Sequence, residues 1–420
     1  MADWYNAVTW LVLGALAAVN LTVLLYRTER GSRIRPWVLG ALRRISGRDD
    51  LRWLDWQPLL VATGVAFACV SAYGILSGQY GCRPGGSDPI TLLNSGRAFW
   101  AGNSPFQVSQ CLHTGEIPYG LAAILLTAIG SLGGMPGVYL VWGLVAVSII
   151  PLVWSIAGDD RRYVTVFVST SVLLVPVICS QIDGTTNAIV PATVLLSIYL
   201  ASRRELLAAV VGGFLSTARF PNLLPILGET GSFARRRALS FVLAAGVFAA
   251  VTGLTYLVWG QQFLTIVFFQ QLGRRSFSVN VYGIFLLSNS LPGGLGVEAL
   301  EGALTVALLA AVLLWVRSLL ISACIVLVGF ALLTPFLSYN ILIWLLPVAL
   351  VGARARWWLW GVAFVGSLNY GLALNVWAWD DGVTWPSMAL DVVLTALLLL
   401  LFVELWRSEL TSRRTVASSA

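Results

Sequence analysis

The sequence predicts an all-α membrane protein that crosses the bilayer about 11 to 13 times. Of its 420 residues, 58% are hydrophobic and 11% are charged, whereas soluble domains carry about 25% charged residues. Many apolar runs approach or exceed the roughly 20 residues that a helix needs to cross a bilayer. Backbone polar groups must be satisfied inside the hydrocarbon layer, so we expect helices rather than an open sheet. These observations exclude a soluble protein.

Charge and the rare reactive residues exclude several other functions. The formal net charge is +7, but the arginines cluster in short stretches between apolar runs, where they set the orientation of the chain. No basic patch with interleaved aromatic residues lies outside the apolar runs, so nucleic acid is not an expected partner. The single histidine, His113, argues against a histidine-built metal site and a Ser-His-Asp triad. We therefore expect neither a metal nor a cofactor.

The first two predicted spans set the orientation of the whole chain. Tyr5–Tyr26 is followed by eight arginines in the segment 27–52, which must be cytoplasmic. We expect the first span to be retained, because it lacks the small-residue cleavage site of a signal peptide. Trp56–Leu76 returns outward and places the loop 78–118 on the extracytoplasmic side. In that loop Cys82 and Cys111 form either a disulfide, if the compartment is oxidising, or two free thiols.

The next two apolar pieces leave two topologies open. Tyr119–Leu132 is short for a span, and Val138–Ile156 is followed by the charged stretch Asp159–Arg162. If both pieces cross, this stretch lies outside. If the first piece is re-entrant or interfacial, the stretch lies inside, as its arginines prefer. We favour the second topology.

A helical hairpin is predicted near the middle of the chain. Val164–Ser180 leads outward and Ala188–Ala201 returns. The segment 206–228 then lies between two arginine-rich stretches, so it should leave and re-enter on the same side. Pro221 forces the break between its two short helices, which places Arg219 at the outward tip.

The remaining spans enclose a second external region. Leu239–Trp259 leads outward into the segment 260–296, whose amphipathic part 261–272 should lie along the membrane interface. Five further spans follow: Leu300–Leu314, Leu319–Phe336, Ile341–Val351, Trp357–Asn375 and Met388–Trp406. Since no internal repeat or linker is recognisable, we predict one domain over residues 1–420, in the plasma membrane.

Several polar and charged residues, whose placement at membrane depth costs free energy, lie on the predicted external side. The loop 78–118 contributes Asp88 as the candidate catalytic residue. Ionisable residues at membrane depth are candidates for function. The candidate substrate-binding residues are Arg219, Arg274, Arg275, Gln181, Asp183, Asn187, Asn289, Tyr339 and Asn340. A carboxylate facing arginines suits the deprotonation of a hydroxyl while the arginines hold an anionic leaving group such as a lipid phosphate.

Five of these residues also have a plain structural explanation. Asp88 suits the start of a helix. Arg219 suits a long side chain that reaches from a span end to the interface. Asp183 suits a turn with Gly184. Arg274 and Arg275 suit an exposed surface.

Several segments resemble motifs of one family in their order along the chain. They are Asp88–Phe106, Ile117–Gly134, Ser180–Asn187, Gly212–Pro225, Ser288–Leu291 and Thr334–Pro347. Together they resemble the C-type membrane glycosyltransferases (GT-C), closest to the alpha-mannosyltransferases and arabinofuranosyltransferases of actinobacterial envelope synthesis. The chain departs from that pattern at Pro89, where a second acidic residue or an aromatic is usual, and at Asn340, where a histidine is usual.

The resemblance implies an enzyme whose active site faces the extracytoplasmic side. It would transfer mannose or arabinofuranose from a polyprenyl-phosphate donor to a lipid-linked or polysaccharide acceptor in envelope synthesis. Asp88 would act as general base, and Arg219, with Arg274 or Arg275, would stabilise the departing phosphate. The alternatives from other classes are a transporter or flippase for a lipid-linked or anionic substrate and an inert scaffold of an envelope-synthesis complex.

Overall fold

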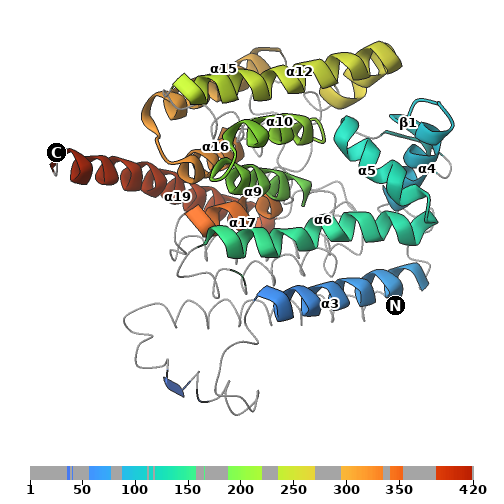
Figure 1. Ribbon diagram of the computed structural model, residues 1–420, viewed down its shortest axis with the longest axis horizontal. Helices are drawn as coiled ribbons and strands as arrows, with labels where there is room; N and C mark the ends of the chain where they lie inside the picture. Colours follow the sequence, from blue (N-terminus) through green and yellow to red (C-terminus); the bar gives the residue numbers. More distant parts are fainter. Residues whose placement is uncertain are drawn as a thin grey trace.

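The computed structural model describes twelve stretches of the chain. They are residues 36–37, 40, 56–76, 88–110, 113–116, 119–157, 165, 188–219, 235–269, 295–333, 341–352 and 385–418. Helices account for most of these residues, as the sequence predicts (Figure 1). In the described part of the chain, two helices are long and apolar enough to cross a membrane, Gly134–Ile156 and Ala238–Val267.

The first described helices follow the predicted spans closely. Helix α3 (Trp56–Leu76) has the predicted bounds, and α4 (Asp88–Trp100) follows it. Helix α5 (Leu121–Ser131) has 11 residues and is therefore about 16 Å long. That is too short for a hydrocarbon layer of about 30 Å, which favours the topology in which this piece does not cross. Helix α6 (Gly134–Ile156) begins four residues earlier than Val138, the start that the sequence predicts.

A β-hairpin between α4 and α5 was not predicted. Strand β1 (Gln107–Gln110) pairs antiparallel with β2 (His113–Glu116), and Gln107 lies opposite Glu116. The strands have four residues each, so they lack the long alternating pattern that identifies a strand in a sequence. The all-α prediction therefore holds for the bundle and misses this hairpin in the predicted external loop.

The middle of the chain supplies α9 (Ile189–Ala201), α10 (Glu205–Ser216) and α12 (Arg235–Leu264). Helix α10 is the first arm of the predicted hairpin, and the helix ends just before the tip at Arg219; the second arm lies outside the described residues. In α12 the backbone leaves the helical conformation at Gly260 (φ 63°, ψ −149°), one residue after the predicted end of the span. A short π-helix, η5 (Thr265–Phe269), follows.

The last described helices are α15 (Leu295–Trp315), α16 (Leu319–Leu333), α17 (Ile341–Gly352) and α19 (Trp385–Ser418). Helix α19 continues beyond Trp406, where the sequence predicts the end of the last span. The apolar run does end there, but no glycine or proline follows to stop the helix. The predicted spans Tyr5–Tyr26 and Trp357–Asn375 lie outside the described stretches, as does Val164–Ser180 except for residue 165.

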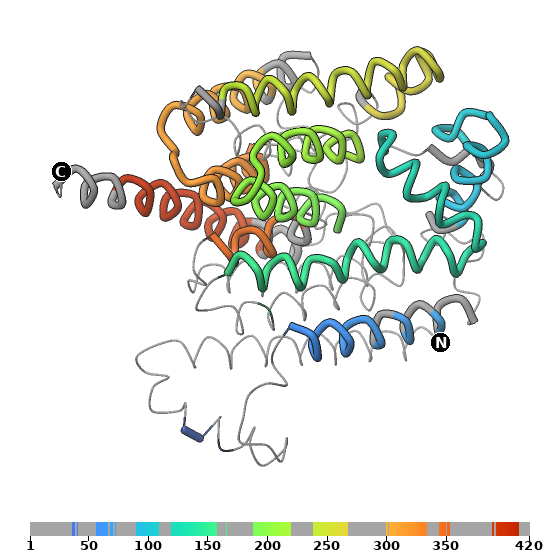
Figure 2. Tube along the Cα trace, in the orientation of Figure 1, coloured from blue at the N-terminus to red at the C-terminus, as the bar shows by residue number. Residues whose placement is uncertain are grey.

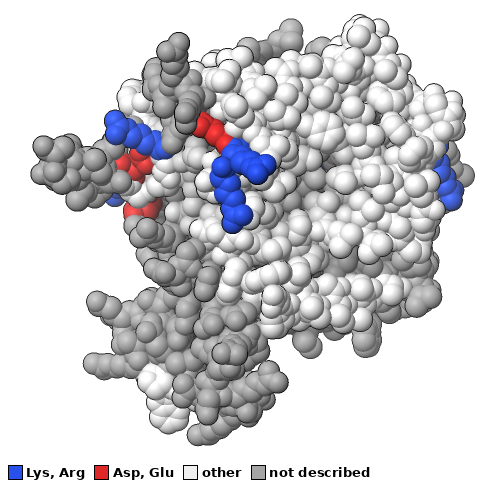
Figure 3. All heavy atoms as spheres, viewed as in Figure 1, with Lys and Arg blue, Asp and Glu red and all other residues white. Residues whose placement is uncertain are grey.

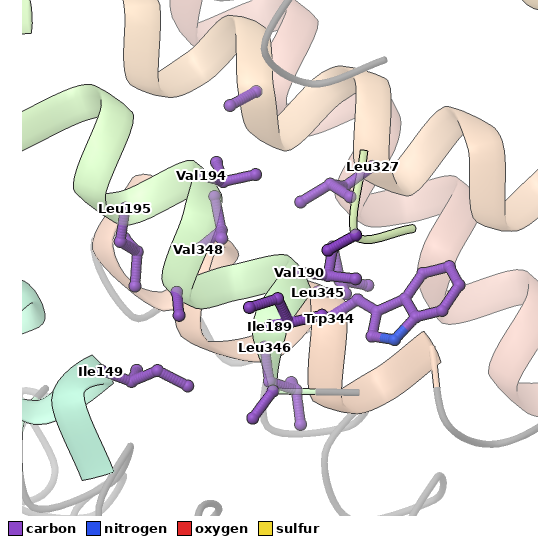
Figure 4. Packing of buried hydrophobic residues seen from close by; sticks show 14 of the residues in the cluster. Ile149, Ile189, Val190, Val194, Leu195, Leu327, Trp344, Leu345, Leu346 and Val348 are labelled. Carbon is purple, nitrogen blue, oxygen red and sulfur yellow. The ribbon is translucent and has the colours of Figure 1, made fainter. Parts of the chain in front are cut away.

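The core lies among α6, α9, α16 and α17. Nine of the 13 residues of α9 are buried, so this helix is enclosed on nearly all sides, as expected for a helix that is apolar all round. Its neighbours contribute side chains such as Leu327 and Val348, which Figure 4 shows near Val194, and Ile149 of α6 belongs to the same cluster. The sequence alone shows only that each of these helices is apolar.

Helix α12 lies at the outside of the bundle (Figures 1 and 2). Its outer surface is apolar, with Leu254, Leu257 and Val258 exposed to 60%, 78% and 68%. Figure 3 shows a surface that is largely free of charge, with most of the described charged side chains gathered toward the end that carries the C terminus. An apolar girdle with charges at an end is the surface expected of a helix bundle in lipid.

Candidate functional site

Arg219 is the candidate site residue whose side-chain contacts the structure describes. Its Cζ lies 5.2 Å from the centre of the Tyr119 ring and 5.0 Å from the centre of the Trp344 ring, over both rings. Tyr119 and Trp344 are buried, with 6% and 5% of their surfaces exposed, and Arg219 is half-buried. Both separations fall within the range of about 6 Å at which a cation is attracted to an aromatic face.

Backbone contacts bring Arg219 to Tyr119. The end of α10 meets the start of α5: the N–H of Gly120 donates a hydrogen bond to the carbonyl oxygen of Ala218 (3.1 Å). The N–H of Ala122 donates to Oγ1 of Thr217 (3.3 Å). These bonds satisfy donors at the N-terminus of α5 that have no partner within the helix. The residue before Gly120 and the residue after Ala218 are therefore held side by side.

Glycine at position 120 is required for this approach. A Cβ built at Gly120 would overlap the carbonyl group of Thr217. The backbone of Gly120 is extended (φ −83°, ψ −171°), a conformation open to any residue, so the requirement is for space alone. This role is not recognisable in the sequence, because an isolated glycine before an apolar run has many explanations.

Trp344 completes the site from a distant part of the chain. It lies on the first turn of α17, which packs against α9 and α16. Figure 4 shows the indole near Val190, Leu345 and Leu327. In the sequence Trp344 looks like one more interfacial tryptophan. The only hint in the sequence is that Trp344 comes four residues after the candidate Asn340, which itself lies outside the described residues.

The arrangement holds a permanent positive charge at a fixed place. Arginine is protonated at all relevant pH values and has five N–H donors in a planar group. Aromatic rings stabilise the cation without neutralising it. An oxyanion, such as a phosphate or a carboxylate, is the ligand that suits this chemistry.

The predicted external loops also meet away from Arg219. Phe106, just before β1, is fully buried and packs against Trp259 (5.6 Å between ring centres) and Phe263 (5.1 Å) at the end of α12. Nearby, Nε2 of Gln262 donates a hydrogen bond to Oε1 of Gln107 (2.5 Å). The loop 78–118 and the start of the region 260–296 thus lie at the same end of the molecule, as the predicted topology requires.

Asp88 begins α4, which agrees with its alternative explanation as the start of a helix. Packing against α5 fixes the direction of α4. Gly96 lies against Ser131, where an added Cβ would come within 2.6 Å of the serine Cβ, and Nε1 of Trp100 donates to the carbonyl of Ala128 (2.7 Å). The two helices therefore run in opposite directions, so the N-terminus of α4 lies toward the C-terminal end of α5.

Asp88 and Arg219 consequently belong to opposite ends of α5, a helix about 16 Å long. The side chain of Asp88 lies outside the described part of the structure. A base and a leaving-group clamp must both reach one reacting carbon. The packing therefore gives Arg219 a well-defined environment and leaves its cooperation with Asp88 a prediction.

The other candidates lie outside the described residues. They are Arg274, Arg275, Gln181, Asp183, Asn187, Asn289, Tyr339 and Asn340, and the loop cysteines Cys82 and Cys111 lie outside them too. Where the structure does describe the chain, no group of three or more His, Cys, Asp or Glu residues is placed to hold a metal ion.

Comparison with known proteins finds no matching family model, no similar curated protein and no similar solved structure. The class of protein that the structure itself supports is a helical bundle that has, among its described residues, two long apolar helices and a half-buried arginine held by two aromatic rings.

Proposed function

We propose that the protein is a multi-pass membrane glycosyltransferase that takes its sugar from a polyprenyl-phosphate donor, with Arg219 binding the phosphate. The observation that carries the proposal is the Arg219 site with Tyr119 and Trp344. The proposal also rests on the resemblance of its motifs to C-type glycosyltransferases.

The phosphate assignment follows from the surroundings of Arg219. The guanidinium is partly withdrawn from water, where charge attraction is stronger than at an exposed surface. A phosphate on a lipid chain is an anion that can reach such a position from within the membrane. When the sugar is transferred, the bond between its anomeric carbon and the phosphate oxygen breaks and a second negative charge develops on that phosphate. A fixed cation beside it therefore lowers the energy of the transition state.

In this proposal Asp88 acts as the base that takes the proton from the acceptor hydroxyl. The acceptor is a glycolipid or a polysaccharide, and the sugar is mannose or arabinofuranose. Because Asp88 and Arg219 lie toward opposite ends of α5, their two roles need separate tests. Loss of the base should lower kcat and leave KM nearly unchanged, whereas loss of the phosphate contact should lower kcat and also raise KM, because that contact serves both donor binding and the departing phosphate.

The test is sugar transfer by the full-length protein in proteoliposomes. Radiolabelled polyprenyl-phosphate mannose and polyprenyl-phosphate arabinofuranose are supplied separately, with envelope glycolipid and polysaccharide as acceptors. The wild type should incorporate label from one donor. Arg219→Gln should lose about 10- to 100-fold in kcat/KM, the equivalent of one hydrogen bond to a charged group.

A matched control is available at the other end of the bundle. The Cζ of Arg203 lies 4.5 Å from the centre of the Tyr199 ring, and Arg203 is exposed at the end of α9. Arg203→Gln removes the same charge from a similar aromatic contact and should leave transfer unchanged. Incorporation by Arg219→Gln equal to the wild type would refute the phosphate role, and equal incorporation by Asp88→Asn would refute the base. No label from either donor would favour the transporter or the scaffold.

A further inference from the structure

The contacts of Arg219 come from two parts of the chain that are far apart in sequence. Tyr119 precedes α5, and Trp344 lies on α17. Both rings are buried, and Cζ of Arg219 lies about equally far from each, at 5.2 and 5.0 Å. A surface arginine that merely reaches toward the interface would not need two buried rings from separate helices.

We propose that Tyr119 and Trp344 are positioning residues, which fix the Arg219 guanidinium for an anionic ligand. This inference rests on the proposed function, in which the ligand is the phosphate of a lipid-linked donor. The two rings add to that proposal an explanation of why the arginine is ready to bind before the donor arrives.

The physical argument concerns conformational freedom. A free arginine side chain loses rotamer entropy when it is held in one place. If the loss occurs on binding, it weakens the affinity for the ligand; if the folded protein has already imposed it, binding is correspondingly tighter. Two buried rings restrict the side chain of Arg219 in advance, and their faces attract the cation without cancelling its charge.

The backbone junction supports the same conclusion. Ala218 accepts a hydrogen bond from Gly120, the residue after Tyr119. This hydrogen bond joins the main chain next to Tyr119 to the main chain next to Arg219. The Tyr119 ring therefore has little freedom to move away from Arg219. Trp344 then links this junction to α17. A shift of α17 would move the Trp344 ring and so change the surroundings of the Arg219 side chain.

The test compares Trp344→Leu with Trp344→Phe. Leucine keeps an apolar side chain in the buried position but removes the aromatic face, whereas phenylalanine retains a face. The probe is farnesyl phosphate, whose retention by purified protein in lipid nanodiscs is measured by equilibrium dialysis. Trp344→Leu should weaken binding about 3- to 10-fold, and Trp344→Phe should restore most of it. Arg219→Lys should bind weakly, because the ammonium lacks the planar set of donors.

A second measurement keeps the two proposals distinguishable. The melting temperatures of Arg219→Gln, Trp344→Leu and the double variant form a double-mutant cycle. The melting temperature of the double variant should fall by less than the two single variants' decreases added together. The reason is that each single variant has already lost the contact between Arg219 and Trp344. Additive shifts, or full binding by Trp344→Leu when the wild type binds, would overturn the positioning role alone. Failure of the wild type to bind farnesyl phosphate would overturn the phosphate site, and the positioning role with it.

Discussion

Replacing Gly120 by alanine should damage the junction between α5 and α10. The new Cβ would overlap the carbonyl group of Thr217. A backbone carbonyl cannot rotate away as a side chain can, so the two segments must separate. Overpacking of this kind costs about 1 to 3 kcal/mol. Separation also weakens two hydrogen bonds, from Gly120 to Ala218 and from Ala122 to Thr217, each of which contributes about 1 kcal/mol.

The total expected loss is therefore about 2 to 5 kcal/mol in the free energy of unfolding, a large part of the 5 to 15 kcal/mol that stabilises a typical protein. The assay is unfolding in mixed micelles of dodecyl maltoside and increasing sodium dodecyl sulfate, followed by the loss of helical circular dichroism. The midpoint should move to a lower mole fraction of the ionic detergent.

Gly246→Ala is the control for this measurement. Gly246 lies within α12, and a Cβ there would have no atom within 4 Å. Alanine is favoured over glycine in a helix by about 1 kcal/mol, so this variant should be as stable as the wild type or slightly more so. A Gly120→Ala protein that unfolds within about 0.5 kcal/mol of the wild type would refute the steric argument, and with it the close approach that places Arg219.

Three further stability predictions use the same unfolding assay. Glu409→Gln should cost about 1 to 3 kcal/mol, because the buried carboxylate accepts a hydrogen bond from the N–H of Arg317 (2.8 Å), and an unchanged midpoint would show that the neutral amide serves as well. Phe106→Ala should cost about 3 to 5 kcal/mol, since the ring is fully buried; a loss below about 1 kcal/mol would contradict its packing at the end of α12. Gly213→Val should cost about 1 to 3 kcal/mol, because even a Cβ there would come within 2.5 Å of the carbonyl oxygen of Ala244, and full stability would mean that α10 and α12 do not pack closely at this point.

Much of the helical framework follows from the sequence because hydrophobic length and arginine placement are local properties. The bounds of α3 agree with the prediction residue for residue. Helix α10 ends five residues before Pro221, the residue that the sequence predicts to interrupt the helix. The kink at Gly260 lies one residue from the predicted end of its span. The small differences at the start of α6 and the end of α19 arise because a helix extends beyond its apolar part until a residue stops it.

The sequence by itself determined that the helix is interrupted near Arg219, and α10 does end at Ser216; the position of Arg219 at the external tip of a hairpin stays a prediction. The partners of this arginine, Tyr119 and Trp344, came only from the tertiary structure, because they are 100 or more residues away along the chain and belong to other helices. The short strands of the β-hairpin were likewise invisible to periodicity. Helix formation depends on the residues within a few positions, whereas the contacts of a side chain depend on how whole helices pack. The structure alone therefore decided which residues hold the arginine, and placed Asp88 toward the other end of α5.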